Sequence, residues 1–231
     1  MLLRGKRVTM SLPLTGAGPS AAGGAAVPWY LSGGILAANC VAAYQPKGAA
    51  SLAASYVNLA NPGTYDAALG VAPTWAAGTG WTFNGSTQWL DTGIVPAGGY
   101  SMLVQFANAV GAGNHGHGVY AAAGQRFYVR PRSGGVSRIY GYGDTGQVIA
   151  GAPAAGNMAI AGPQGYLNGV ADGGAPGAWV ATVLSIAIGA ENGIGLPIGN
   201  WFQGDVIAAA VYNSTLTAPQ VAAVAAAMAA L

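Results

Sequence analysis

The residues best suited to binding chemistry alternate with apolar residues in one short segment. They are Arg126, Tyr128, Arg130 and Arg132, and Phe127 and Val129 lie between them. Because successive side chains of a strand point to opposite sides of its sheet, this spacing predicts one basic face and one apolar face. Guanidinium groups bind carboxylates and phosphates through paired hydrogen bonds. The segment can thus engage an acidic glycan, a phosphate or a neighbouring subunit, and a solvated face without a ligand is the alternative.

The carboxylates of the chain are few and far apart. They are Asp66, Asp91, Asp144, Asp172, Glu191 and Asp205. Glycoside hydrolysis requires two carboxylates about 5–10 Å apart across the scissile bond, and no two of these acids lie within ten residues of each other in the sequence. The chain also has no Gly-x-Ser-x-Gly motif to hold a nucleophilic serine. These absences predict a protein that is not an enzyme, and a glycoside hydrolase that uses Glu191 is the least favoured function.

The two histidines and the single cysteine offer little further chemistry. His115 and His117 flank Gly116, and imidazoles at this spacing can lie on one side of an extended segment, as a metal pair requires. The chain has no third histidine and glycines surround the pair, so a flexible loop is favoured over a metal site. Cys40 lies in an apolar run without a disulfide partner, which favours a buried and inert thiol.

Charge is scarce along the whole chain. Only 6% of its 231 residues are charged, whereas about 25% is usual. A free monomer normally keeps a charged surface, so this composition favours assembly with other subunits, most simply as a homo-oligomer. No stretch predicts a membrane helix, because prolines and glycines interrupt the longest charge-free run.

The first segment of the chain differs from the rest. Residues 1–38 are rich in glycine, alanine and proline and predict an irregular arm that can dock on a neighbouring subunit. Arg4, Lys6 and Arg7 are three of the eight bases, so the remainder carries five bases against six acids and is nearly neutral. A basic arm can contact an acidic partner, but a solvated terminus is favoured and no specific nucleic-acid binding is expected.

From residue 39 onward, short apolar runs alternate with turn residues, as is typical of an all-β chain. Three Asn-Gly pairs, Asn84-Gly85, Asn168-Gly169 and Asn192-Gly193, suit the positive φ angles of a tight hairpin. The first pair is predicted to join strands 81–83 and 88–90. Period-two patterns predict that three further sets each share one strand face: Met102, Val104 and Phe106; Thr182, Leu184, Ile186 and Ile188; Val206, Ala208, Ala210 and Tyr212. Because many intervening residues are apolar too, several strands are expected to be buried on both faces.

One helix is expected, at the C-terminal end of the sequence. Thr217, followed three residues later by Gln220, matches a capping box, and the proline between them is tolerated in a first turn. Residues 221–231 are almost entirely alanine, valine, methionine and leucine. A helix over 217–231 that is apolar on all sides is expected to pack against the sandwich or against a neighbouring subunit.

Five motifs occur in order between residues 39 and 231. They are Val41-Ala42-Ala43-Tyr44, Trp81-Thr82-Phe83-Asn84-Gly85-Ser86, Tyr166-Leu167-Asn168-Gly169, Ile188-Gly189, and Val211-Tyr212-Asn213 followed by Leu216-Thr217. Together they resemble the laminin-G-like jelly rolls, a family with the concanavalin A-like fold. The resemblance implies two antiparallel sheets packed as a jelly-roll sandwich, with a short C-terminal helix. Family members include glycan-binding lectins, adhesion modules and phage structural or tail proteins, so the fold leaves the function open.

The resemblance also bears on catalysis and on metal binding. Hydrolases of the concanavalin A-like superfamily carry their carboxylates on one strand as Glu-x-Asp-x-Glu, and this chain lacks that motif. Some members bind calcium at the rim of the sandwich through aspartates, and Asp91, Asp172 and Asp205 lie at predicted strand ends. An ordinary turn role is favoured for each of them, and no cofactor is expected.

These observations favour a non-enzymatic structural protein of a bacteriophage virion, either a capsid decoration or a tail-associated subunit with its neighbours in the particle as partners. The low charge, the arm-like first segment and the missing catalytic set support this interpretation. The alternative is a carbohydrate-binding or host-adhesion module whose arginine face contacts a surface glycan. The two functions are compatible, because a virion subunit can also bind a glycan.

Overall fold

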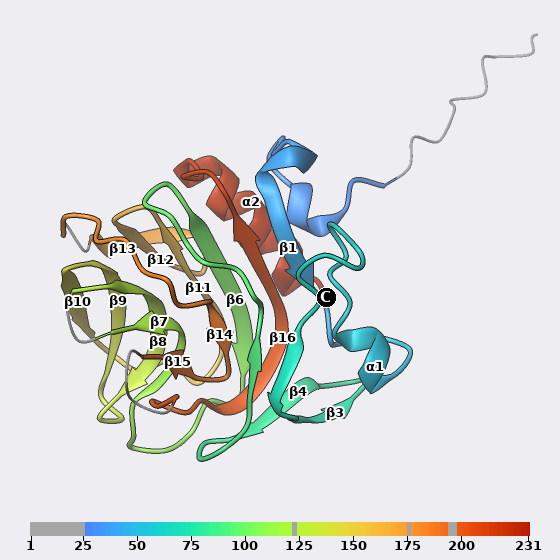
Figure 1. Ribbon diagram of the computed structural model, residues 1–231, viewed down its shortest axis with the longest axis horizontal. Helices are drawn as coiled ribbons and strands as arrows, with labels where there is room; N and C mark the ends of the chain where they lie inside the picture. Colours follow the sequence, from blue (N-terminus) through green and yellow to red (C-terminus); the bar gives the residue numbers. More distant parts are fainter. Residues whose placement is uncertain (1–25, 122–123, 175–176, 194–197) are drawn as a thin grey trace, which may run out of the picture.

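The computed structural model describes residues 26–121, 124–174, 177–193 and 198–231. Two β-sheets of eight strands each pack face to face, and a helix, α2, lies at the C-terminal end of the chain (Figure 1). Among the described residues, β15 pairs with β7 in parallel and the other paired strands are antiparallel. The predicted fold class, an all-β sandwich with a C-terminal helix, is confirmed.

Sheet A is organised around its longest strand, β16. Its strands follow the order β13-β12-β11-β6-β16-β4-β3, and β1 also pairs with β16. Their bounds are β1 Cys40–Tyr44, β3 Thr74–Ala76, β4 Gly80–Asn84, β6 Ser101–Ala107, β11 Gly156–Ala161, β12 Gln164–Leu167, β13 Val170–Gly174 and β16 Gln203–Tyr212. The first half of β16 pairs with β4 and the second half with β1, while β6 runs along its other side.

Sheet B carries the segment that the sequence singles out for binding. Its order is β10-β9-β8-β7-β14-β5-β2, with β15 also paired to β7. The bounds are β2 Ala68–Val71, β5 Trp89–Asp91, β7 His115–Tyr120, β8 Arg126–Ser133, β9 Ser137–Gly143, β10 Thr145–Ala150, β14 Ala187–Ile188 and β15 Glu191–Asn192. The helical segments are η1 Trp29–Leu31, η2 Ala37–Asn39, α1 Leu52–Ser55 and α2 Ala218–Ala229.

The main core lies between the two sheets. Met102, Val104 and Phe106 of β6 belong to the same buried cluster as Phe127 and Val129 of β8. The face predicted for β6 is therefore confirmed. Burial of each large side chain contributes about 1.5–3 kcal/mol relative to its exposure to water, so this cluster fixes which side of β8 points inward.

A second cluster lies on the outer face of sheet A. Leu103 of β6 and Tyr212 of β16 pack there with Val221, Val224 and Met228 of α2. The helix begins as predicted, since the backbone N–H of its N-cap residue, Thr217, donates to Gln220 Oε1 at 3.0 Å. Sheet A is thus buried on both faces and α2 packs on its own sandwich. No described helix is long and apolar enough to cross a membrane.

The described part of the predicted arm runs along the same side of the sandwich. Ile35 is buried in the second cluster, and the Tyr212 hydroxyl donates to the backbone oxygen of Tyr30 at 2.9 Å. The remainder of the arm, residues 1–25 with its three bases, lies outside the described residues. Docking of the arm on a neighbouring subunit stays a prediction.

The three Asn-Gly pairs differ, and neither residue of Asn192-Gly193 has a positive φ angle. Asn168 and Gly169, with φ angles of 51° and 78°, join β12 to β13 as the predicted hairpin. The hairpin predicted at Asn84-Gly85 is wrong, because β4 belongs to sheet A and β5 to sheet B. Asn84 Oδ1 instead accepts hydrogen bonds from the backbone N–H groups of residues 86 and 87, both at 3.0 Å. This side-chain turn redirects the chain from one sheet to the other.

Two of the period-two predictions are wrong in part. Val206 belongs to the core between the sheets, whereas Ala208 and Ala210 face α2, because the pairing with β6 shifts between residues 206 and 208. One extra residue in a strand reverses the faces of all that follow. In the strand predicted over 182–188, only Ala187–Ile188 are in a strand, and Val183 is 84% exposed.

The flexible loop favoured at residues 115–117 is also wrong, because these residues begin β7 and both histidines are buried. His117 Nδ1 accepts a hydrogen bond from the backbone N–H of Gly189 at 3.0 Å, and its ring lies 4.5 Å from that of Phe202. Burial, with a smaller contribution from His115, lowers the pKa of His117 to about 3. The imidazole is therefore a neutral core residue near neutral pH.

Acid should destabilise the fold through His117. In the unfolded chain this histidine takes up a proton as the pH falls through about 6.5, whereas in the folded chain it resists protonation down to about 3. The free energy of unfolding should therefore fall between these limits by up to about 1.4 kcal/mol per pH unit. Denaturant unfolding at several pH values should show a smaller pH dependence for His117→Asn, with a remainder from His115, whose pKa is lowered too. An unchanged pH dependence in the variant would contradict this assignment.

Candidate functional site

Strand β8 divides its side chains between the core and the outer face of sheet B. Phe127 and Val129 point into the core between the sheets. The residues that alternate with them, Arg126, Tyr128 and Arg130, are therefore on the opposite side. This arrangement brings three of the four predicted site residues together on one sheet face.

Glycines of the neighbouring strands leave room on this face for the ring of Tyr128. Gly118 of β7 and Gly141 of β9 both lie directly opposite Tyr128 in the strand register. A Cβ atom at residue 141 would lie 2.1 Å from the tyrosine ring, and one at residue 118 would lie 2.7 Å from the tyrosine Cα. The ring therefore lies flat against the backbone of β9, where any side chain larger than hydrogen would displace it.

Arg130 covers this ring and is held there by Glu191 of β15. The Arg130 Cζ lies 4.9 Å from the Tyr128 ring centroid. Its Nε and Nη2 donate to Glu191 Oε1 and Oε2 at 2.9 and 2.6 Å, and Asn200 Nδ2 donates to Oε2 at 2.7 Å. Gly116 leaves space for the Glu191 carboxylate, since a Cβ at residue 116 would lie 1.9 Å from Oε1. Both partners are buried, at 6% and 3% exposure.

Glu191 stabilises the charged form of Arg130 and also neutralises its charge. Burial opposes ionisation of the guanidinium, yet the hydrogen bonds and charge of Glu191 raise the Arg130 pKa above its ordinary value. Burial raises the pKa of the Glu191 carboxyl, and Arg130 and Asn200 act against that rise. Both carboxylate oxygens of Glu191 are therefore engaged in a structural ion pair.

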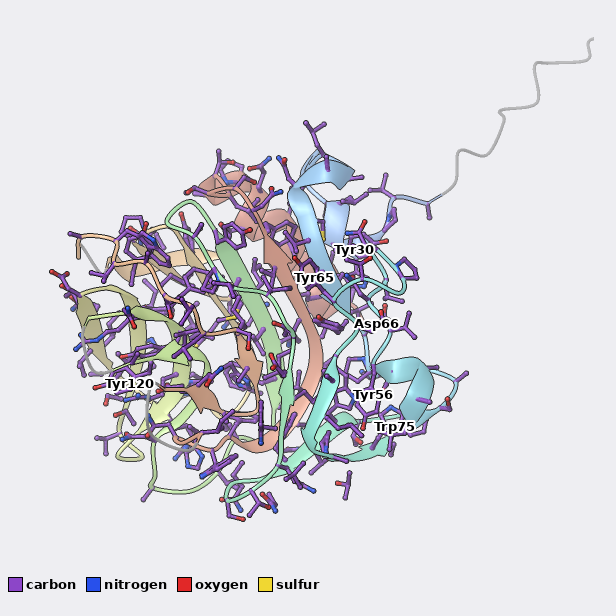
Figure 2. All side chains as sticks on the ribbon, viewed as in Figure 1. Tyr30, Tyr56, Tyr65, Asp66, Trp75 and Tyr120 are labelled. Carbon is purple, nitrogen blue, oxygen red and sulfur yellow. The ribbon has the colours of Figure 1, made fainter. Side chains whose placement is uncertain are left out.

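The exposed part of the face is formed by Tyr120, the last residue of β7, and Arg126, the first residue of β8, which are paired with each other. Tyr120 is 39% exposed and stands edge-on to Tyr128, with ring centroids 5.5 Å apart and planes at 86°. The Cζ atoms of Arg126 and Arg130 both lie 5.5 Å from the Tyr120 centroid. Figure 2 places Tyr120 at one end of the molecule, on sheet B. We call Tyr120, Arg126, Tyr128 and Arg130 the tyrosine–arginine face.

Arg126 is the member of this face that keeps donors free for a ligand. It is partly exposed, and it makes no hydrogen bond or ion pair with the residues that the structure describes. Its Nε is buried without an acceptor. An arginine with free terminal donors beside an exposed aromatic ring can hold a polar group of a ligand through paired hydrogen bonds.

Arg132, the fourth predicted residue, is not part of the face. The pairing of β8 with β9 is irregular between Arg130 and Ser133, where Pro131 has no N–H to donate. Arg132 Nε and Nη1 instead donate to the backbone oxygens of Gly111 and Ala152 at 3.0 and 3.1 Å. Arg132 therefore stabilises the two loops that contain Gly111 and Ala152.

Sequence reasoning missed Tyr120, Glu191 and the glycines that make room for the cluster. A usable signal was present, because glycine recurs at period two in the two strands that flank β8, at 116 and 118 in β7 and at 141 and 143 in β9. Glycine in a strand interior often marks a close approach of another group to the backbone. The pairing of Glu191 with Arg130, 61 residues apart, left no comparable signal.

The three aspartates considered for calcium each have partners within the protein. Asp172 accepts from Arg138 Nε and Nη2, both at 2.5 Å, and Asp205 accepts from Thr82 and Asn108 at 2.5 and 2.7 Å. Asp91 Oδ1 accepts from the backbone N–H of residue 93 at 2.8 Å, as in an ordinary turn. Within the described ranges, no three His, Cys, Asp or Glu side chains gather in a way that could hold a metal ion.

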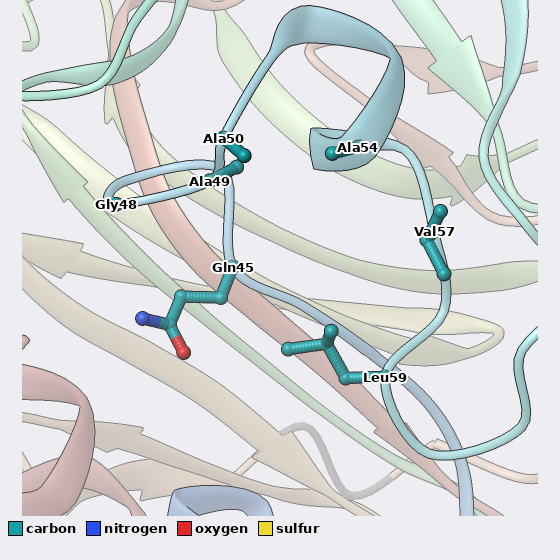
Figure 3. Close-up of a pocket in the computed structure, with 7 residues that line it drawn as sticks. All are labelled: Gln45, Gly48, Ala49, Ala50, Ala54, Val57 and Leu59. Carbon is teal, nitrogen blue, oxygen red and sulfur yellow. The ribbon is translucent and has the colours of Figure 1, made fainter.

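A separate pocket of about 300 Å³ lies beside α1 (Figure 3). Alanines and the side chains of Val57 and Leu59 make up most of its lining, with Gln45 as the polar residue. The Gln45 Oε1 already accepts a hydrogen bond from Trp29 Nε1 at 2.9 Å. The pocket thus lacks the charge and the exposed ring that the tyrosine–arginine face combines.

Removing either charge of the buried pair should destabilise the protein. Glu191→Gln leaves the Arg130 charge buried without a counter-ion, which should lower the free energy of unfolding by about 3–5 kcal/mol. The double variant Arg130→Met/Glu191→Leu removes both charges and should be more stable than Glu191→Gln. Denaturant unfolding of the three proteins tests this, and a double variant less stable than the single one would contradict a structural role for the pair.

No protein-family model matches the chain, and no curated protein matches it in sequence. Solved structures do match its fold. Domain 4 of an extracellular GH43 arabinanase from Geobacillus stearothermophilus, in complex with arabinotriose, is similar with a TM-score of 0.53 at 17% identity, over 81% of this chain and 98% of that one. The receptor-binding domain of botulinum neurotoxin type G is similar with a TM-score of 0.51 at 10% identity, over 80% of this chain and 50% of that one. The chain thus shares its two-sheet β-sandwich fold with these two domains.

Proposed function

We propose that the protein is a carbohydrate-binding module and that its tyrosine–arginine face contacts the sugar. The observation that carries this proposal is the exposed ring of Tyr120, held edge-on against Tyr128 and flanked by two guanidinium groups. The exposed part of the Tyr120 ring offers a sugar an apolar surface, and Arg126, which lies over this ring, offers donors to oxygen atoms. The tyrosine and the arginine together therefore match the apolar C–H surface and the polar oxygen atoms of a sugar ring.

The face is organised before any ligand arrives. Tyr128 is fixed by the glycines below it, Arg130 is fixed by Glu191, and Tyr120 packs on both. A site whose side chains are already ordered loses less conformational entropy on binding. Rigid support of this kind favours recognition of a ligand over a merely solvated surface.

The fold comparison supports the class of ligand. The arabinanase domain, which the present chain matches over 98% of that domain's length, is in complex with arabinotriose. The assignment of the sugar site to the outer face of sheet B rests on the geometry of Tyr120 and Arg126. We propose binding without hydrolysis, since Glu191 is engaged in an ion pair and the carboxylates are scattered in the sequence.

A place in a phage virion stays a prediction, as does a homo-oligomer. The low charge of the chain favours both. The C-terminal helix gives them no support, because its apolar residues pack on sheet A of the same chain. Sugar binding is compatible with either, since a subunit on a particle surface can serve as an adhesion module.

Truncation of the exposed ring should weaken sugar binding. On a glycan array that includes arabinotriose, the protein should bind at least one sugar, and Tyr120→Ala should lower the affinity for it by about tenfold or more. Tyr120→Phe should keep most of the affinity, because the ring remains. Tyr65→Ala, which truncates another exposed tyrosine (Figure 2), should bind as the unaltered protein does.

Two results would overturn the proposal. One is an array without any bound sugar. The other is a Tyr120→Ala variant that folds and binds with unchanged affinity, which would place the sugar elsewhere on the protein.

A further inference from the structure

We propose that the sugar residue bound at this face carries one negatively charged group and that Arg126 binds this group. This inference rests on the proposed function and adds the chemical class of the ligand. A carboxylate or a sulfate ester would supply such a charge.

Arg126 differs from the other arginines that the structure describes by its lack of partners. Arg130 is neutralised by Glu191 and Arg138 by Asp172. Arg132 donates to backbone oxygens of the loops around it. For Arg126, no hydrogen bond or ion pair is found among the described residues. The charge of Arg126 is therefore the one on the tyrosine–arginine face that lacks compensation.

The surroundings of Arg126 are unfavourable in the absence of an anion. Its Nε is buried without an acceptor, and a buried donor without a partner lowers stability. Arg126 and Arg130 also converge on the same tyrosine ring, each with Cζ at 5.5 Å from its centroid, although Glu191 offsets only the charge of Arg130. A bound anion would supply the missing counter-charge. These features favour a site for an anion over a solvated sheet face.

The geometry of Arg126 also indicates how the anion would bind. Arg126 is partly exposed, and only its Nε is a buried atom without a partner, so a ligand would bind through the two terminal nitrogens, Nη1 and Nη2. Gly146 of β10 lies beside Nη1, since a Cβ there would be 3.6 Å from this nitrogen, in van der Waals contact with it. Two oxygens of one anionic group can accept parallel hydrogen bonds from these nitrogens. Tyr120 lies beside the guanidinium, so one sugar residue can contact both side chains.

The test compares an acidic sugar with its neutral methyl ester and with a sugar that carries a different anionic group. Trigalacturonic acid, its fully methyl-esterified form and a sulfated galactose trisaccharide are titrated into the full-length protein by calorimetry. The acid should bind about 10- to 100-fold more tightly than its methyl ester, because charge-assisted paired hydrogen bonds are lost in the ester. Its affinity should also fall as salt is added, since Arg126 is partly exposed.

Variants of the protein test whether Arg126 causes the preference for the acid over its ester. Arg126→Gln should lose the preference for the acid, and Arg126→Lys should keep part of it, because lysine retains the charge without the planar pair of donors. Lys47→Gln removes an equal charge from the segment that follows β1 and should keep the full preference. Thermal unfolding provides a second readout, in which Arg126→Gln should not lower the midpoint, since it removes a buried donor without a partner.

The outcomes separate this inference from the proposed function. Equal binding of the acid and its ester would overturn the inference and leave a neutral-sugar module. Loss of the acid preference in Lys47→Gln, or its survival in Arg126→Gln, would overturn it as well. Absence of binding to these sugars and to every sugar on the array would overturn both. Tight binding of the sulfated sugar that depends on Arg126 would support the inference and identify sulfate as a source of the charge.

Discussion

The ion pair between Arg130 and Glu191 is the interaction on which the outer face of sheet B depends. Both side chains are buried, and Gly116 provides the space that the carboxylate fills. Arg130, fixed in this way, covers the ring of Tyr128 and flanks Tyr120. A buried charge without its partner is strongly unfavourable, so neither residue can be replaced alone without loss of this order. The pair therefore connects the short strand β15 to the face proposed for binding.

The two sheets of the sandwich have different roles. Sheet A is packed on both sides, by the common core and by the apolar residues of α2. Sheet B shares the core and carries the tyrosine–arginine face on its other side. Charged residues are scarce in the chain, and two of its arginines, Arg130 and Arg138, have carboxylate partners inside the protein. A single uncompensated arginine next to an exposed tyrosine is then the main electrostatic feature of that face.

Features that depend on local sequence could be predicted, and those that depend on distant contacts could not. The period-two pattern of β6, the positive φ angles at Asn168-Gly169 and the capping box at Thr217 each arise within a few residues, and each was predicted correctly. The bulge after Val206 and the burial of His117 depend on how strands distant in sequence pair and pack. For the site, the alternation along β8 placed Arg126, Tyr128 and Arg130 on one face, whereas the irregularity at Pro131 removed Arg132 from it. The free donors of Arg126 became evident only once the partners of the other arginines were known.

The most direct test of the central claim is to map the sugar on the protein by amide NMR. The backbone resonances are assigned, and a sugar that binds on the array is titrated into the protein. Binding at the tyrosine–arginine face predicts the largest shifts at the amides of Tyr120, Arg126 and Gly141, with little change around α1. Largest shifts in the pocket lined by Gln45, Ala54 and Leu59, with those of β7 and β8 unchanged, would contradict the assignment of the site.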